Sequence, residues 1–77
     1  MNKLRRKALQ DVFDKLSDLQ EELTSIKDEE DESRDNMPEN LQGSERYEQS
    51  ETALYSIDEA IEYLSSACDS IESAMEG

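Results

Sequence analysis

Apolar residues follow a seven-residue repeat through the first half of the chain. They recur at alternating spacings of three and four, which places them on one stripe of an α-helix: Leu9, Val12, Leu16, Leu19, Leu23 and Ile26. Phe13 and Ala8 widen this stripe, as suits a helix that packs against more than one neighbour. We therefore predict a helix over about residues 3 to 36.

The second half repeats the rhythm and adds a row of small residues beside it. The seam there consists of Leu54, Ile57, Ile61, Leu64, Cys68, Ile71 and Met75, and Tyr47 extends it upstream with Ser50 as a polar interruption. Alanine recurs every seven residues alongside: Ala53, Ala60, Ala67 and Ala74. This predicts a helix over about residues 44 to 76 that approaches two neighbours, unless alanine is present only as the best helix former.

The stretch between the two patterns reads NMPENLQGSERY and carries the signals that end one helix and start another. Pro38 disfavours the α conformation at Met37, so the first helix should end near Asn36. Ser44 is a natural N-cap for the second helix. The connector is predicted at about residues 37 to 43, and the acidic run of residues 28 to 35 before it leaves open whether that segment is helical.

These elements predict an all-α protein with one domain over residues 1 to 77, folded as an antiparallel two-helix hairpin of the coiled-coil type. The chain has 77 residues, 34% of them hydrophobic, with no Trp, no His and one Cys. A chain this short rarely builds an adequate core alone, and neither a disulfide nor the usual zinc ligands can supplement it. We expect it to assemble into a homo-oligomeric helical bundle, as a dimer or a higher oligomer.

The net charge of the chain limits the classes of partner that it can bind. The net charge is −13, from 21 acids and 8 bases, and four of those bases lie at the start: Lys3, Arg5, Arg6 and Lys7. The chain from residue 8 onward therefore carries −17, which argues against direct nucleic-acid binding and favours a basic partner or simple solvation. No apolar run long enough for a signal peptide or a membrane span follows the basic start, so we expect a cytoplasmic protein without membrane contact.

Carboxylate pairs three residues apart, such as Glu59 and Glu62, are the one feature that suggests catalysis. All-α nucleoside triphosphate pyrophosphohydrolases hold magnesium with such pairs, but here the pairs lie off the apolar seam. We expect no metal, no cofactor and no catalytic residue. Cys68 lies on the seam and should be a buried small apolar residue. Tyr55 and Tyr63 lie off the seam, either at an oligomer interface or on the surface.

The connector holds the candidate binding residues. Their amides, hydroxyls and guanidinium could form a recognition tip, or an anion pocket where several connectors meet in an oligomer: Asn40, Gln42, Ser44, Arg46 and Tyr47. A purely structural turn is the alternative.

Several stretches together resemble a known family. The basic start MNKLRRKAL, the acid-rich first helix, the connector MPENLQGSERYE and the Ala- and Glu-rich second helix are similar to small acidic helical-hairpin proteins encoded by bacteriophages and integrative elements of Gram-positive bacteria. The resemblance covers nearly the whole chain, and the connector is its most specific part. It brings no catalytic residue with it and implies an accessory protein of a mobile element.

The function we expect is that of a non-enzymatic, self-associating binding protein that antagonises a bacterial defence system. It would either occlude a basic host protein with its acidic surface or sequester a nucleotide signal at the connector. Two alternatives stay open: an acidic DNA mimic that inhibits a nucleic-acid-binding protein, and a purely structural dimerisation module.

Overall fold

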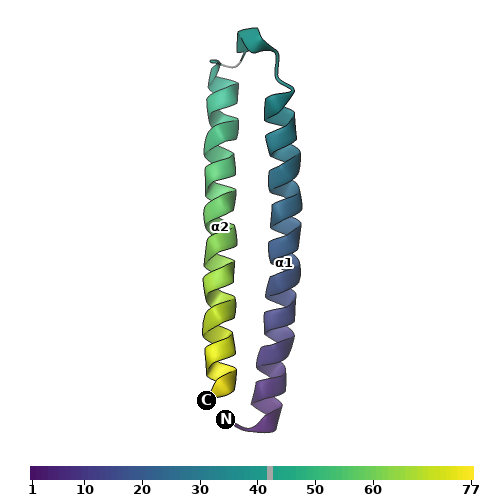
Figure 1. Cartoon of the computed structure of the whole chain (residues 1–77), viewed down its shortest axis with the longest axis vertical. Helices are drawn as coiled ribbons and strands as arrows, with labels where there is room; N and C mark the ends of the chain where they lie inside the picture. Colours follow the sequence, from purple (N-terminus) through teal and green to yellow (C-terminus); the bar gives the residue numbers. More distant parts are fainter. Residues whose placement is uncertain (42) are drawn as a thin grey trace.

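The computed structural model of the chain describes residues 1–41 and 43–77. It contains two long helices, α1 (Lys3–Asp35) and α2 (Glu45–Glu76), and between them a short 3-10 helix, η1 (Glu39–Leu41). The long helices lie side by side with both chain termini at the same end (Figure 1), in a rod that extends 60 × 14 × 12 Å. The described residues include no strand, which confirms the all-α class and the packing of two helices against each other.

The ends of α1 follow from local chemistry. Asn2 is the N-cap, and its side chain accepts a hydrogen bond from the backbone N–H of Arg5 at 2.8 Å. The helix continues through the acidic run of residues 28 to 35, which settles the question that the sequence left open. It ends at Asp35 with Asn36 as the C-cap, two residues before Pro38, as predicted.

The start of α2 depends on Ser44, which is the N-cap as predicted. The hydroxyl oxygen of Ser44 accepts a hydrogen bond from the backbone N–H of Tyr47 at 3.4 Å and donates one to the carbonyl of Leu41 in η1. Glu45 and Glu48 place negative charge in the first turn, next to unpaired backbone N–H groups. One serine thus fixes both the start of α2 and the end of the connector.

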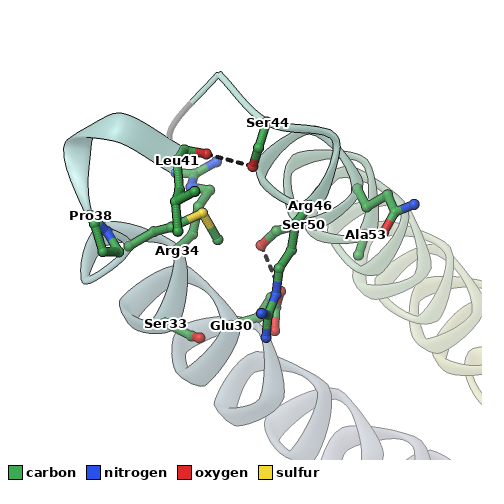
Figure 2. A pocket seen from close by; sticks show the side chains of 11 residues that line it. Glu30, Ser33, Arg34, Pro38, Leu41, Ser44, Arg46, Ser50 and Ala53 are labelled. Carbon is green, nitrogen blue, oxygen red and sulfur yellow. Dashed lines mark hydrogen bonds between the residues drawn. The ribbon is translucent and has the colours of Figure 1, made fainter.

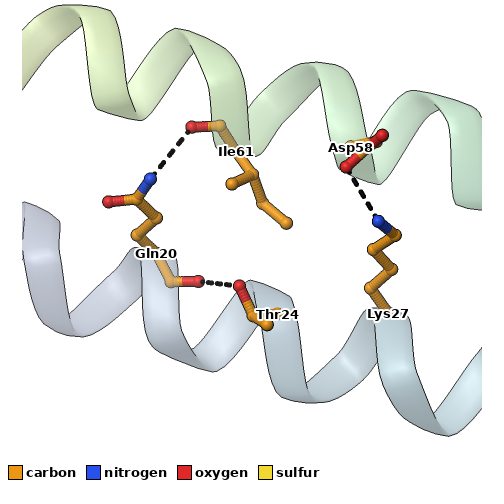
Figure 3. A network of polar contacts seen from close by, with 5 residues as sticks. All are labelled: Gln20, Thr24, Lys27, Asp58 and Ile61. Carbon is orange, nitrogen blue, oxygen red and sulfur yellow. Dashed lines mark hydrogen bonds and ion pairs between the residues drawn. The ribbon is translucent and has the colours of Figure 1, made fainter.

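Polar contacts join the two helices along their whole length and make the fold a two-helix hairpin. The paired residue numbers rise along α1 as they fall along α2: Arg6 with Met75 at 3.1 Å, Gln20 with Ile61 at 3.4 Å, Lys27 with Asp58 at 2.9 Å, and Glu30 with Ser50 at 2.6 Å. Figure 3 shows the middle two of these contacts, which bridge facing segments of the hairpin.

The core of the hairpin is thin. The buried apolar side chains among the described residues are Leu54 and Cys68, each 7% exposed, and the thiol of Cys68 is free. The burial of Cys68 agrees with its predicted role as a small apolar residue. Most other residues of the α2 seam are half-buried against α1, which is what two helices alone can achieve.

The line along which α1 contacts α2 is rotated from the apolar stripe predicted from the sequence. Leu9, Leu16 and Leu23 are half-buried as the stripe predicts. The other three residues of the stripe stand largely in solvent, with exposed fractions of 43%, 48% and 50%: Val12, Leu19 and Ile26. Polar side chains of Gln20 and Lys27 occupy the opposite edge of the contact line instead. The hairpin therefore uses one edge of the stripe and leaves the other uncovered.

The basic start of the chain meets the end of α2 through a hydrogen bond. Within residues 1–41 and 43–77, no ion pair joins the basic residues at the start of the chain to Asp69, Glu72 or Glu76. The guanidinium Nε of Arg6 instead donates to the backbone carbonyl of Met75. The last carbonyls of a helix have no partner within it, and α2 has no basic residue in its last turn, so α1 supplies the missing donor.

We predict that Leu54→Ala lowers the free energy of unfolding by about 2–3 kcal/mol, because a cavity replaces part of one of the few buried apolar side chains. Chemical denaturation followed by circular dichroism, at one fixed protein concentration, measures the change. The neighbouring Tyr55 is 80% exposed and serves as the control, since Tyr55→Ala should stay within about 0.5 kcal/mol of the wild type. Equal losses in the two variants would contradict the placement of the core.

Candidate functional site

A pocket lies at the connector end of the hairpin, where the end of α1, η1 and the start of α2 converge (Figure 2). Its volume is about 660 Å³. Polar and apolar side chains line it together: Glu30, Ser33, Arg34, Met37, Pro38, Leu41, Ser44, Arg46, Gln49, Ser50 and Ala53. This is the region in which the sequence placed its candidate binding residues.

Two polar residues on the helix seams, Glu30 and Ser50, line one side of the pocket and are joined by a hydrogen bond. Ser50 is buried, and its hydroxyl donates to the Glu30 carboxylate at 2.6 Å. Each residue interrupts the apolar line of its own helix, and the register of the hairpin brings the two interruptions together. The carboxylate thereby satisfies the buried hydroxyl, which would otherwise be costly to bury.

Arg34 is held from two sides beneath the connector. Its Nη2 lies 3.0 Å from the carboxylate of Asp31, one helical turn earlier, and its guanidinium carbon lies 5.7 Å from the centre of the Tyr47 ring. The second contact is a cation–π interaction across the two helices. The Nε of Arg34 is buried and has no hydrogen-bond partner among residues 1–41 and 43–77. Arg34 therefore fastens the end of α1 to the start of α2.

The candidate residues named from the sequence separate into different roles. Ser44 and Arg46 line the pocket, and Arg46 is exposed to solvent. Tyr47 faces Arg34 and is half-buried. Asn40 lies exposed in η1 and does not line the pocket. Gln42 lies outside the described residues.

Sequence reasoning missed Glu30 and Arg34 as members of this site. Glu30 belongs to the acidic run of residues 28 to 35, in which the sequence suggests no binding residue. Arg34 continues a seven-residue line with Gln20 and Lys27, all three half-buried toward α2. That polar line, adjacent to the apolar stripe, was the available signal, because polar residues repeating every seven positions contact the same neighbour.

The charges around the pocket nearly cancel. Arg34 and Arg46 contribute two positive charges, while Glu30 lines the pocket and Asp31 pairs with Arg34. A single chain can thus offer Arg46 to one anionic group, with the Ser33 hydroxyl as a further donor, because the Ser44 hydroxyl already donates to Leu41. Several phosphates would need further cations from another chain.

A second pocket, of about 850 Å³, lies at the open end of the hairpin. It places Lys3, Arg6 and Lys7 of α1 beside Glu72 and Glu76 of α2. Charges of both signs line it, so it presents no field of one sign to a charged ligand.

The acids of α2 all lie on one side of the helix. When the seven-residue repeat is lettered a to g with Leu54 at a, the contact line with α1 falls on a and d, and the nine acids fall on b, e and f: Glu45, Glu48, Glu51, Asp58, Glu59, Glu62, Asp69, Glu72 and Glu76. Positions c and g carry none. We call the b, e and f positions the acidic side of α2.

In the part of the chain that the structure describes, one ion pair crosses between the helices, and it lies at the edge of this acidic side. Lys27 Nζ contacts Asp58 at 2.9 Å (Figure 3). The hydrogen bond to Asp58 and the nearby carboxylates raise the pKa of Lys27 above its ordinary value of 10.5. Because the folded pKa is the higher one, any stability from this pair is complete below pH 10.5 and is lost as the pH rises through the folded pKa. Both groups are partly exposed, so the pair fixes register more than it adds stability.

Within residues 1–41 and 43–77, no three acidic, Cys or His residues come together in a group able to hold a metal ion. In the same residues, no helix combines the length and the apolar character needed to cross a membrane. No protein-family model, curated protein or solved structure matches this chain.

We predict that Ser50→Ala lowers the free energy of unfolding by about 1–2 kcal/mol, because the Glu30 carboxylate loses its donor from α2. Urea denaturation at fixed protein concentration measures the loss. Ser56→Ala makes the same chemical change at an exposed position of the same helix and should leave stability within about 0.5 kcal/mol. A Ser50 variant as stable as the Ser56 variant would show that the bond contributes nothing.

Proposed function

We propose that this chain is a non-enzymatic binding protein that works as a self-associated bundle of antiparallel helical hairpins. In this proposal its acidic sides face outward and occupy a basic protein partner. The observation that carries the proposal is the separation of surfaces on α2, where acids occupy one side and small or apolar residues occupy the other. Such a helix can bury one side against its own kind while presenting the other to a partner.

Self-association is supported by the incomplete burial of the hairpin. Three residues of the apolar stripe of α1 are 43% to 50% exposed: Val12, Leu19 and Ile26. Leu16 and Leu23 of the same stripe are more deeply buried. Covering the three exposed residues would supply apolar burial that a thin two-helix core lacks. Oligomerisation is one common way in which chains of this size become stable.

A basic protein as the partner is supported by the charge and its placement. Nine carboxylates repeat along a helix of 32 residues, on the side opposite the alanines, and one of them, Asp58, pairs with Lys27 of α1. A partner that normally holds nucleic acid offers the matching cations, so inhibition by DNA mimicry is one form of this proposal. The resemblance to small proteins of phages and integrative elements suggests a component of a bacterial defence system as the target.

A second candidate function is the sequestration of a nucleotide signal at the connector pocket. Arg46 favours it, since this exposed guanidinium lines a pocket together with the hydroxyl group of Ser33. The near balance of charge in one chain weighs against it unless two pockets combine. Native mass spectrometry of the protein purified from cells that express a nucleotide-based defence system tests it. A retained mass of a few hundred daltons that is lost on Arg46→Gln would support this candidate, and a clean homo-oligomer would count against it.

The main proposal predicts that neutralising the acidic side abolishes antagonism. The variant Glu51→Gln, Glu62→Gln, Asp69→Asn changes three exposed carboxylates of α2 that make no hydrogen bond within the described residues. The measurement is the plating efficiency of a phage on cells that carry a panel of defence systems and express either the wild type or the variant. We expect the wild type to restore plating on at least one system and the variant to restore it at least tenfold less.

A matched control changes net charge equally elsewhere. Asp11→Asn, Asp18→Asn, Glu21→Gln alters three exposed carboxylates of α1 and should retain activity. Equal loss in both variants would mean that total charge matters rather than the acidic side. Full activity in the α2 variant, with expression and helix content unchanged, would exclude the acidic side as the binding surface.

A further inference from the structure

One face of the hairpin joins two rows of residues, one from each helix. The outer row of α1 repeats every seven residues: Arg5, Val12, Leu19, Ile26 and Ser33. The alanine row of α2 does the same: Arg46, Ala53, Ala60, Ala67 and Ala74. Ser33 from the first row and Arg46 and Ala53 from the second line the same connector pocket (Figure 2). Because both rows keep the seven-residue repeat of the helix contact, they share this face along the rod.

The apolar residues of the outer row stand where the hairpin leaves them exposed. Leu19 is 48% and Ile26 50% exposed, whereas the next residues along the chain, Gln20 and Lys27, turn toward α2 and hydrogen-bond to it. A hairpin that functioned alone would gain by the reverse arrangement, with leucine inside and glutamine outside. The helix is therefore patterned for a neighbour on the outer-row side as well as for α2.

Charge identifies what that neighbour can be. None of the ten residues in the two rows is acidic, in a chain with 21 acids and a net charge of −13. A basic partner would find no carboxylate in either row to pair with. A second copy of this highly acidic chain, by contrast, needs an approach that keeps like charges apart, and this face provides one. Its outermost neighbours on α2 are also uncharged: Gln49, Ser56, Tyr63 and Ser70.

Shape points to the same occupant. The face carries large side chains in the outer row of α1 and small ones in the alanine row of α2. A two-fold axis would therefore place the outer row of each copy against the alanine row of the other. Two helices side by side are about 20 Å wide, and the alanine row spans about 32 Å at 1.5 Å per residue. Two such faces would together bury on the order of 1,300 Å², which is within the range of specific dimers.

We propose that a second copy of this chain docks on this face, about a two-fold axis parallel to the helices, with each outer row over the partner's alanine row. The inference rests on the self-association in the proposed function and names its surface and geometry. Because Gln20 contacts Ile61, Leu19 and Ala60 lie at about the same height along the helix axes within one hairpin. An axis parallel to the helices preserves that height, so Leu19 of each copy meets Ala60 of the other, and the two Arg46 side chains come to one end of the dimer.

The first test is the oligomeric state of surface variants, measured by light scattering after size exclusion and by sedimentation equilibrium. Leu19→Glu and Ala60→Glu place a charge on the proposed interface and should raise the dimer dissociation constant at least a hundredfold. Tyr55→Glu places the same charge on the acidic side of α2 and should change the constant less than threefold. Circular dichroism at high protein concentration checks that the variants remain helical.

A second test fixes the geometry and does not depend on tolerating a buried charge. In a Cys68→Ala background, chains with Leu19→Cys are mixed with chains with Ala60→Cys and oxidised. A disulfide-linked dimer should form in the mixture and not with either variant alone. In the proposed bundle, the axes of neighbouring helices are about 10 Å apart. The two α1 helices lie on a diagonal of the bundle, so their axes are roughly 14 Å apart, and the same holds for the two α2 helices. A disulfide requires Cα atoms closer than about 7 Å.

The outcomes separate this inference from the proposed function. A wild type that stays monomeric at 100 μM or more overturns both, with the concentration set well above the dissociation constant of an ordinary specific dimer. A dimer that both Leu19→Glu and Ala60→Glu leave intact overturns this face while self-association stands. Efficient disulfide formation by Leu19→Cys alone overturns the parallel axis, because it would require α1 to pack on α1 of the partner.

Discussion

The limited contact between two helices is the constraint on which the rest of this structure depends. Each helix can bury only the line that faces its neighbour, and here that line buries Leu54, Cys68 and Ser50 and half-buries the remaining seam. The apolar stripe of α1 is wider than one neighbour can cover, so Val12, Leu19 and Ile26 remain in solvent. Removing apolar area from water is as favourable when two chains associate as when one chain folds. Burial of the uncovered edge would therefore contribute free energy to association.

Specific polar contacts hold the hairpin where its apolar seam stops. Toward the connector the α1 line passes from leucines to Glu30 and Arg34, and burial alone can no longer fix how the helices meet. The hydrogen bond between Glu30 and Ser50 and the cation–π contact of Arg34 with Tyr47 take over that role. Each depends on one side chain from each helix, so a slip of a single residue would break both. The connector end is thus defined by register, while the middle of the rod is defined by apolar packing.

Sequence was sufficient for the elements and insufficient for the way they face each other. The seven-residue repeats, Pro38 and Ser44 predicted two helices and their ends, because capping and the proline restriction act over a few residues. Ser44 and Arg46, two of the candidate binding residues predicted from the connector sequence, line the pocket. The partners Glu30 and Arg34 were not predicted, since their roles arise only from the register between helices. The rotation of the α1 contact line also escaped prediction, because apolar periodicity marks a stripe without stating how many neighbours share it.

The division of α2 into an acidic side and an acid-free side links stability to recognition. Two chains of charge −13 repel each other, and the repulsion weakens with the distance between their charges. If the acid-free faces are the ones that meet, every carboxylate of α2 points away from the interface, where water and salt screen it. The same arrangement leaves those carboxylates available to a cationic partner. Association and partner binding would then use opposite sides of one helix, so that neither needs to displace the other.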